Sequence, residues 1–271
     1  MTAALLTPPP PRAAERYRRS LWLLTKRDLK VRYSTSFLGY FWSILDPLVM
    51  ALIYWVVFTQ IFHRDHVGEQ PYIVFLLTAL LPWMWFNGSI SDSTRAFTKE
   101  AKLIRSTKIP RTIWVVRIVL SKGIEFVVSL PVIVCFALIS LATADAAQLH
   151  VQVFLLPLAI ILQAALTLGV AFIVAPLVVF FRDLERAVKL GLRFLFYASP
   201  IIYGVLDVPS SFKPFLALNP LSGIFSLYRA AFFPGELVWC NVIMSAIMTM
   251  IILVVGIMIF KRAVPAVLKE I

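Results

Sequence analysis

Charged side chains are scarce in this sequence. Only 15% of its 271 residues are charged, acidic residues number 14, and 60% of the chain is hydrophobic. A soluble core of this size does not need so much apolar surface, and the mean hydropathy is +0.86. Because about 20 apolar residues in a helix cross a hydrocarbon layer of about 30 Å, the repeated long apolar runs predict an all-α integral membrane protein.

Cysteine and histidine are also rare. The two cysteines, Cys135 and Cys240, lie within or beside apolar runs and have neither metal-ligand spacing nor a disulfide framework. The three histidines fall in predicted outer loops, so no chain of Asp, Glu and His crosses the apolar runs. This lack disfavours a proton-driven mechanism, and no metal site is expected.

Motifs of soluble enzymes are missing as well. The sequence has no G-x-x-x-x-G-K-[ST] phosphate loop, no H-E-x-x-H and no G-x-S-x-G. The first of these motifs cradles nucleotide phosphates, and the other two supply zinc ligands or a nucleophilic serine. We therefore predict a chain that does not hydrolyse ATP by itself and that holds no cofactor.

The N-terminus has no apolar stretch before its first arginines, so it is not typical of a cleaved signal peptide. Consecutive prolines cannot continue a helix, and we predict that residues 1–11 form a disordered tail. Residues 12–36 are predicted as a cytoplasmic interfacial helix, and residues 37–271 as the transmembrane domain.

Apolar runs long enough to cross a membrane predict six spans. Their approximate ranges are 40–62, 71–91, 118–142, 151–181, 187–206 and 237–260. Since the predicted number is even, both ends of the chain are expected on the same side of the membrane.

Lysine and arginine indicate which side this is, because positive charge in short loops stays cytoplasmic. Of the 26 lysines and arginines, only Arg64, Lys213 and Arg229 fall on the side opposite the termini. We therefore expect both termini in the cytoplasm. The net charge of +12 is then a topology signal that also attracts anionic membrane lipid, and it requires no nucleic-acid partner.

Basic residues dominate one side of the segment 13–33, which we expect to lie along the inner membrane surface before the chain turns upward near 34–39. At 100° per residue, six cations fall within a sector of about 100°: Arg12, Arg16, Arg19, Lys26, Arg27 and Lys30. The alternative is a solvated run of charge that only sets topology.

Aromatic residues are concentrated in the first two predicted spans. Tyr40, Phe41 and Trp42 precede Asp46 and Pro47, where the carboxylate is expected to cap the helix or to line a wet cavity. In the second span, three aromatic residues and an amide follow Pro82: Trp83, Trp85, Phe86 and Asn87. Such rings are suited to hold the apolar faces of sugars, although anchoring at the membrane interface explains some of them equally well.

The segment 204–236 is apolar but is divided by four prolines into pieces too short to span a membrane. Irregular backbone at membrane depth requires protein or a water-filled cavity around it. We expect short re-entrant helices that dip from the outer face, with an amphipathic outer loop as the alternative. Within the spans, Glu125 is the main charge, and Lys122 one turn earlier is expected to pair with it; a role in gating or substrate contact is the second reading.

The run at the end of the interfacial segment, RDLKVRYSTSFLGYFWSILDPL, closely resembles the N-terminal signature of ABC-2 type polysaccharide export permeases, the Wzm-like group. The resemblance continues through the basic loop TRAFTKEAKLIRSTKIPR at 94–111 and FFRDLER at 180–186. It ends with LNPLSGIFSLYR at 218–229 and excludes residues 1–11.

This resemblance implies a half-transporter of a bacterial inner or plasma membrane. Two permeases would form a channel for a lipid-linked polysaccharide such as O-antigen, capsule or teichoic acid, and two separate ATPase subunits would bind the ATP and Mg. The implied ATPase-coupling residues lie within 94–108 and 182–189: Arg95, Lys99, Lys102, Arg105, Arg182, Asp183 and Arg186.

The resemblance also implies an entrance for the lipid pyrophosphate at Arg27, Lys30 and Arg32. The implied outer gate lies within 204–236 and includes Pro214, Asn219, Pro220 and Arg229. The aromatic residues of the first two spans would then line the substrate channel.

Other functions remain as alternatives. One is an ABC-2 exporter of another amphipathic substrate, a lipid or a drug. A membrane glycosyltransferase or acyltransferase would need paired carboxylates or a His–Asp pair at one membrane face, and only Asp183 and Glu185, flanked by arginines, offer such a cluster. A secondary transporter would show matching broken helices in its two halves, and the sequence has none.

Overall fold

A computed structural model describes residues 13–33, 41–61, 70–140 and 148–270, and every regular element in these ranges is helical. The predicted tail 1–11, the predicted turn at 34–39 and Tyr40 lie outside the described residues. The helices are α1 (Ala13–Tyr33), α2 (Trp42–Trp55) continued by a π-helix (Val56–Ile61), α3 (Tyr72–Ser93), α4 (Ala101–Ser106), α5 (Ile113–Ser140), a 3-10 turn (Val151–Leu155), α6 (Leu156–Phe180), α7 (Leu184–Ala198), α8 (Lys213–Leu218), α9 (Pro220–Arg229), a 3-10 turn (Pro234–Glu236) and α10 (Trp239–Glu270).

Four helices of the described residues are long and apolar enough to cross a membrane: α3, α5, α10, and α6 together with the turn before it. The first predicted span corresponds to a shorter apolar helix, Leu45–Ile61. The fifth, predicted at 187–206, is replaced by α7, which has 15 residues and ends at Ala198. Its length of about 22 Å follows from Pro200, because a residue before proline avoids helical angles and Ser199 is extended.

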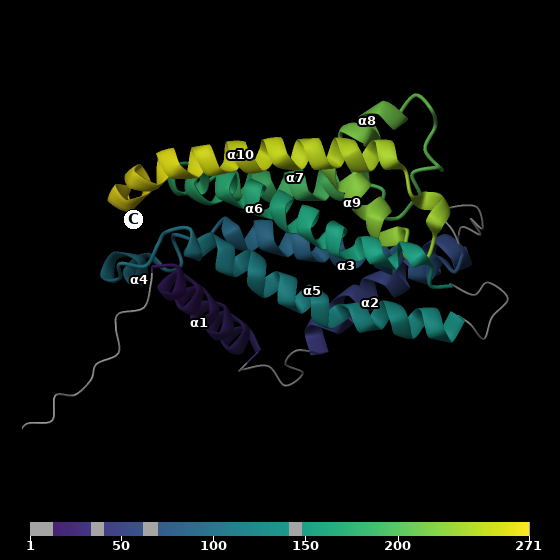
Figure 1. Ribbon diagram of the computed structural model, residues 1–271, viewed down its shortest axis with the longest axis horizontal. Helices are drawn as coiled ribbons and strands as arrows, with labels where there is room; N and C mark the ends of the chain where they lie inside the picture. The colour runs from purple at the N-terminus through teal and green to yellow at the C-terminus, as the bar shows by residue number, and fades with distance from the viewer. Residues whose placement is uncertain (1–12, 34–40, 62–69, 141–147, 271) are drawn as a thin grey trace, which may run out of the picture.

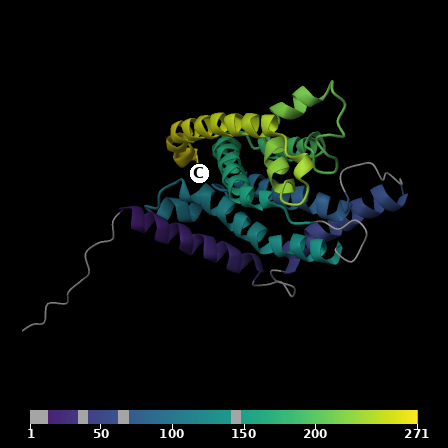
Figure 2. The same ribbon diagram turned by 45° about the vertical axis from the view of Figure 1, so that its right-hand side comes forward.

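The long helices lie side by side along the length of the molecule (Figure 1). Helix α4 and the C-terminal end of α10 are at one end, which we call the charged end, and α8 and α9 are toward the other, the opposite end. Helix α1 runs beside the first half of α5 in both views (Figures 1 and 2). It matches the helix expected over 13–33.

Asp46 does not cap a helix, contrary to one expectation. Helix α2 begins at Trp42, its N-terminal cap position is Phe41, and no side chain caps it. Asp46 therefore lies inside the first turns of α2, directly before Pro47. Asp46 lines a cavity with Arg32 and Lys122, and the expectation that this cavity is wet stays a prediction.

Glycines allow α6 and α10 to pack closely. A Cβ atom added to Gly256 would lie 2.3 Å from the carbonyl oxygen of Gly169, and one added to Gly169 would lie 2.8 Å from the Cα of Leu253. Helices in membranes associate by such close packing of small residues, because lipid provides no hydrophobic drive between them. This pair of helices supports α9, which is buried along its whole length.

Candidate functional site

A groove of about 570 Å³ lies between α2, α3 and α7. It contains two of the aromatic and amide residues selected from the sequence, Trp83 and Asn87. Its other lining residues are Met50, Tyr54, Leu80, Met84, Ser91, Lys189, Leu192, Arg193, Phe196 and Tyr197. The groove therefore combines aromatic rings, an amide, a hydroxyl and two cations on one surface.

The aromatic rings of this groove contact one another across three helices. Phe196 packs edge-on against Trp83, with ring centroids 5.5 Å apart, and stacks against Tyr54 at 5.9 Å. Tyr197 follows at 5.1 Å from Phe196. Phe196 is thus held by rings on α2 and α3, whereas Tyr197 is exposed. The contributions of Tyr54, Phe196 and Tyr197 were not identified in the sequence, since hydropathy does not show which helix faces meet.

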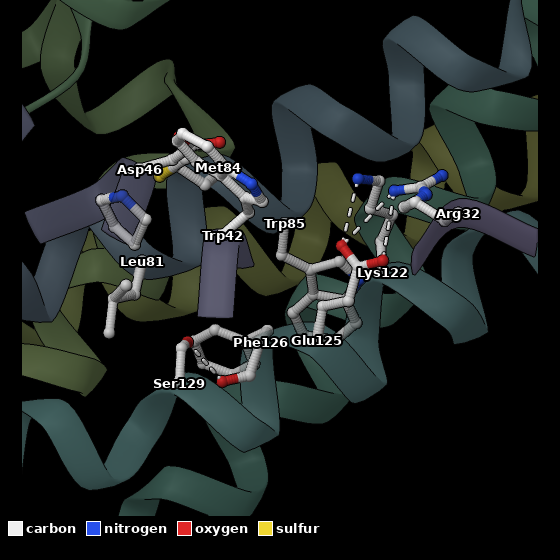
Figure 3. A pocket seen from close by; sticks show the side chains of 11 residues that line it. Arg32, Trp42, Asp46, Leu81, Met84, Trp85, Lys122, Glu125, Phe126 and Ser129 are labelled. Atoms are coloured by element: carbon white, nitrogen blue, oxygen red, sulfur yellow. Dashed lines mark hydrogen bonds and ion pairs between the residues drawn. The ribbon is translucent and has the colours of Figure 1, made fainter. Parts of the chain in front are cut away.

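A second cavity, of about 330 Å³, lies between α1, α2, α3 and α5. Figure 3 shows Arg32 and Lys122 pointing toward the carboxylate of Glu125. Arg32 Nη1 lies 3.1 Å from Glu125 Oε1, and Lys122 Nζ lies 3.1 Å from Oε2. The predicted pair of Lys122 and Glu125 is confirmed, and α1 contributes a second cation to it. Trp42 also lines this cavity.

The aromatic residues selected from the second span are distributed over three environments. Trp85 is buried beneath α5, where its ring stacks on Phe126 at 5.2 Å and its Nε1 donates to the carbonyl of Val119 at 3.0 Å. The ring rests against Gly123 of α5, whose lack of a side chain provides the space. Phe86 is buried and lines a separate apolar pocket between α3, α6, α7, α9 and α10. Phe41, selected from the first span, is exposed.

Ion pairs attach α1 to the charged end of the bundle. Arg27 lies 2.6 Å from Glu100, and Arg32 lies 2.7 Å from Asp92. Asp28 receives two hydrogen bonds of 2.7 Å from Arg117, whose side chain is only 4% exposed. Two of the three cations selected for the lipid pyrophosphate, Arg27 and Arg32, are thus paired, whereas Lys30 is exposed and has no ion-pair partner among the described residues.

At the charged end, one carboxylate joins the loop after α3 to the first turn of α7. Glu185 accepts a hydrogen bond from Nε of Arg95 at 3.1 Å and lies 2.8 Å from Lys189. The hydrogen bond from Arg95 and, to a smaller extent, the one from Lys189 lower the pKa of Glu185 from 4.5 to about 2. Because the folded pKa is depressed, the pair stabilises the fold fully above pH 4.5 and loses this effect as the pH falls through about 2.

The other residues selected for ATPase coupling have exposed side chains that a partner protein could reach. They are Lys99, Lys102, Arg105, Arg182, Asp183 and Arg186. The transferase alternative depended on Asp183 and Glu185. Since Glu185 is held by Arg95 and Lys189, these carboxylates do not form a pair available for general acid and base chemistry.

The opposite end holds a buried charge. Arg229 is 0% exposed and Glu236 is 2% exposed, and their closest charged atoms are 3.5 Å apart. Arg229 also donates to the carbonyls of Ile201 at 2.8 Å and Tyr203 at 3.1 Å, and its guanidinium lies 3.7 Å from the ring centre of Phe75. Glu236 was not selected from the sequence, because no local pattern connects it with Arg229.

The three other residues selected for this end occupy different positions around α8 and α9. Asn219 caps α9 by accepting a hydrogen bond from the backbone of Leu221 at 3.0 Å, and it donates to Ser199 at 2.8 Å. Pro220 begins α9, and Pro214 lies in the exposed first turn of α8. Within the described part of the chain, no group of three His, Cys, Asp or Glu side chains could hold a metal ion.

Comparison with known proteins gives a consistent result. Residues 19–233 match the family described as ABC-2 type transporter. The chain is 36% identical over 242 residues to the O-antigen export system permease protein RfbA of Klebsiella pneumoniae, covering 89% of this chain and 91% of that protein. It is 31% identical to the Myxococcus xanthus protein of the same name over 82% of this chain and 83% of that protein. It is 25% identical to the polysialic acid transport protein KpsM of Escherichia coli over 90% and 93% of the two chains.

Proposed function

Because this chain belongs to the ABC-2 type transporter family, we propose that it is the permease subunit of an ATP-driven exporter of a lipid-linked polysaccharide or related surface glycan. Similarity to an O-antigen export permease over 89% of the chain carries this proposal. The substrate would move from the cytoplasmic side across the inner membrane of a bacterium, and ATP hydrolysis would belong to a separate subunit.

We place the ATPase subunits at the charged end. The loop that contains Arg95 is joined there to the first turn of α7 by the ion pair with Glu185, so a movement of the loop would be passed on to α7. Exposed cations on both segments are suited to an acidic surface of a partner, because complementary charge steers association and sets its register. Two ATPase copies under a permease homodimer give one such contact for each protomer.

The glycan path is placed along the groove between α2, α3 and α7, on the surface that would face the second permease. Sugar rings have apolar C–H faces that pack on aromatic rings, and Trp83 with Asn87 provides a ring and an amide. Replacing Trp83 by leucine keeps the apolar bulk and removes the flat surface. Export should fall while ATP hydrolysis continues, and Trp239→Leu, at an exposed tryptophan outside the groove, is the matched control.

The entrance for the lipid carrier is placed at the basic face of α1, where Arg32 borders the cavity with Lys122 and Glu125. A pyrophosphate group can compete with Asp92 and Glu125 for Arg32, since all three are anions that accept charge-assisted hydrogen bonds. On the opposite side, α8 and α9 would form the outer gate as short re-entrant helices. Arg229 would then hold the gate helix α9 through its buried contacts.

The orientation and the six-span topology have a direct test. Single cysteines placed by Ser20→Cys, Thr98→Cys or Lys269→Cys in a chain whose own cysteines are replaced should react only from the cytoplasm. A Gln148→Cys thiol should react only from outside. Reaction of that thiol from the inside would contradict both the topology and the outer position of α8.

The function itself is tested by reconstitution with an ABC ATPase subunit from the same organism. The purified pair in lipid vesicles should hydrolyse ATP and transfer a lipid-linked glycan. The permease alone should do neither. Modification of the glycan by the permease in the absence of an ATPase would favour the transferase alternative instead.

A further inference from the structure

The groove between α2, α3 and α7 is lined by positive charges and by no negative charge. Lys189 and Arg193 line it, and none of its lining residues is an aspartate or a glutamate. Lys189 pairs with Glu185, which lies outside the groove. Arg193 is exposed and has no ion-pair partner within the described ranges of the chain. One guanidinium is therefore available to an occupant of the groove.

The helical register of α7 directs several cations to the same face. With 3.6 residues per turn, Arg186, Lys189, Arg193 and Tyr197 fall within a sector of about 80° around the helix axis. The buried residues Leu192 and Phe196 hold α7 against its neighbours. The cations thus form a row that begins at the charged end and leads into the groove, where it reaches the aromatic rings.

A charged side chain at the position of Arg193 costs free energy unless water or a bound anion in the groove solvates it. It lies nine residues beyond Leu184, which places it about 13 Å along the helix. The neighbouring side chains Leu190 and Phe194 are exposed and apolar, as expected for a helix next to lipid. Ionisable residues at such positions face a water-filled cavity or pair with a charge, because lipid does not solvate them.

We propose that the groove binds an anionic group of the cargo, a phosphate or a carboxylate, through Arg193 and Lys189. The adjacent sugar ring would pack on Tyr197, whose side chain is exposed in the groove. This inference rests on the proposed export function. It adds that the groove itself recognises a negatively charged group of the exported molecule. The anion has two possible sources: the pyrophosphate of the lipid carrier, or an acidic group on the glycan repeat.

The first measurement is the electrostatic potential of the groove. Ser91 lines the groove and is partly exposed, so a Ser91→Cys thiol in a chain that also carries Cys135→Ser and Cys240→Ser reports on it. The permease, in complex with its ATPase and in discs of neutral phosphatidylcholine, is treated with anionic and cationic methanethiosulfonate reagents. The anionic reagent should react faster, and Arg193→Gln should lower this preference about fivefold, as for a partly exposed charge.

The second measurement is protection of the same thiol. The probes are undecaprenyl pyrophosphate, an oligogalacturonate, and a neutral maltooligosaccharide of equal length. At least one acidic probe should slow the reaction several-fold, and the probe that does so identifies the source of the anion. Arg193→Gln should abolish protection, Arg193→Lys should retain most of it, and Arg262→Gln, an exposed arginine on α10, should leave it unchanged.

Several outcomes would overturn the proposal. These are equal protection by the neutral oligosaccharide, unchanged protection in Arg193→Gln, and a thiol that reacts with no reagent because a second copy of the chain covers the groove. Failure of the export proposal has a different signature, since no variant would then transfer glycan with ATP. Normal export by Arg193→Gln, with no protection by either acidic probe, would contradict the anion site but not the export function.

Discussion

The two ends of the molecule use arginine in opposite ways. At the charged end, Arg32 and Arg95 are partly or largely exposed, and each meets carboxylates on other elements. At the opposite end, Arg229 is fully enclosed and contacts Glu236, two backbone carbonyls and the ring of Phe75. The exposed pairs can exchange partners at little cost, whereas the buried pair cannot. Movable contacts are therefore concentrated where an ATPase and a lipid carrier are proposed to bind.

Removal of the buried cation should have the largest effect. Arg229→Met leaves Glu236 without its charged partner inside the protein, and breaking such a pair costs about 3–5 kcal/mol. The midpoint of thermal unfolding in detergent should fall by about 6 °C or more. Lys213→Met, at an exposed cation of α8, is the control, and equal shifts for the two variants would contradict the difference between the ends.

The contact between Asp28 and Arg117 should rank second, because the Arg117 side chain is only 4% exposed. Asp28→Asn removes the carboxylate from a guanidinium that is 4% exposed, which costs about 1.5–3 kcal/mol for a bond to a charged group. The loss should be visible as a lower unfolding midpoint and faster proteolysis of α1. Glu15→Gln, at an exposed position of the same helix, should change neither property.

Arg32 should have a smaller effect on stability. Arg32→Gln weakens contacts to Asp92 and Glu125 that are partly solvated, and such pairs contribute about 1 kcal/mol or less. Lys122 remains beside Glu125 at 3.1 Å, so that carboxylate keeps a partner. Export should fall more than the unfolding midpoint does. A loss of stability as large as that of Arg229→Met would show that both ends depend on their arginines equally.

The pair of Arg95 and Glu185 should have the smallest effect on stability. Arg95 is 60% exposed, so Arg95→Glu should lower the unfolding midpoint only slightly. It should reduce stimulation of the partner ATPase more strongly, because two carboxylates then repel the loop from the start of α7. Adding Glu185→Arg should restore part of the stimulation. Arg262→Glu serves as the control, and an Arg95→Glu variant with full stimulation would place the coupling contact elsewhere.

Much of the helical framework follows from local sequence. Long apolar runs predict α3, α5, α6 and α10, and a basic amphipathic pattern predicts α1. The pair of Lys122 and Glu125 was also predictable, since residues three apart share a helix face. The fifth predicted span was too long because hydropathy averages over the boundary at Ser199 and Pro200. The six-span topology stays a prediction.

Hydropathy and helix periodicity are local properties, so the amino-acid sequence is enough to predict a helical membrane protein. The contacts of Arg95 with Glu185 and of Arg229 with Glu236 are visible only in the folded chain, as is the placement of Trp83 in a groove and of Trp85 beneath α5. These contacts depend on how each helix is rotated and packed. A helix that is apolar on every side has no periodic pattern that indicates which face its neighbours cover.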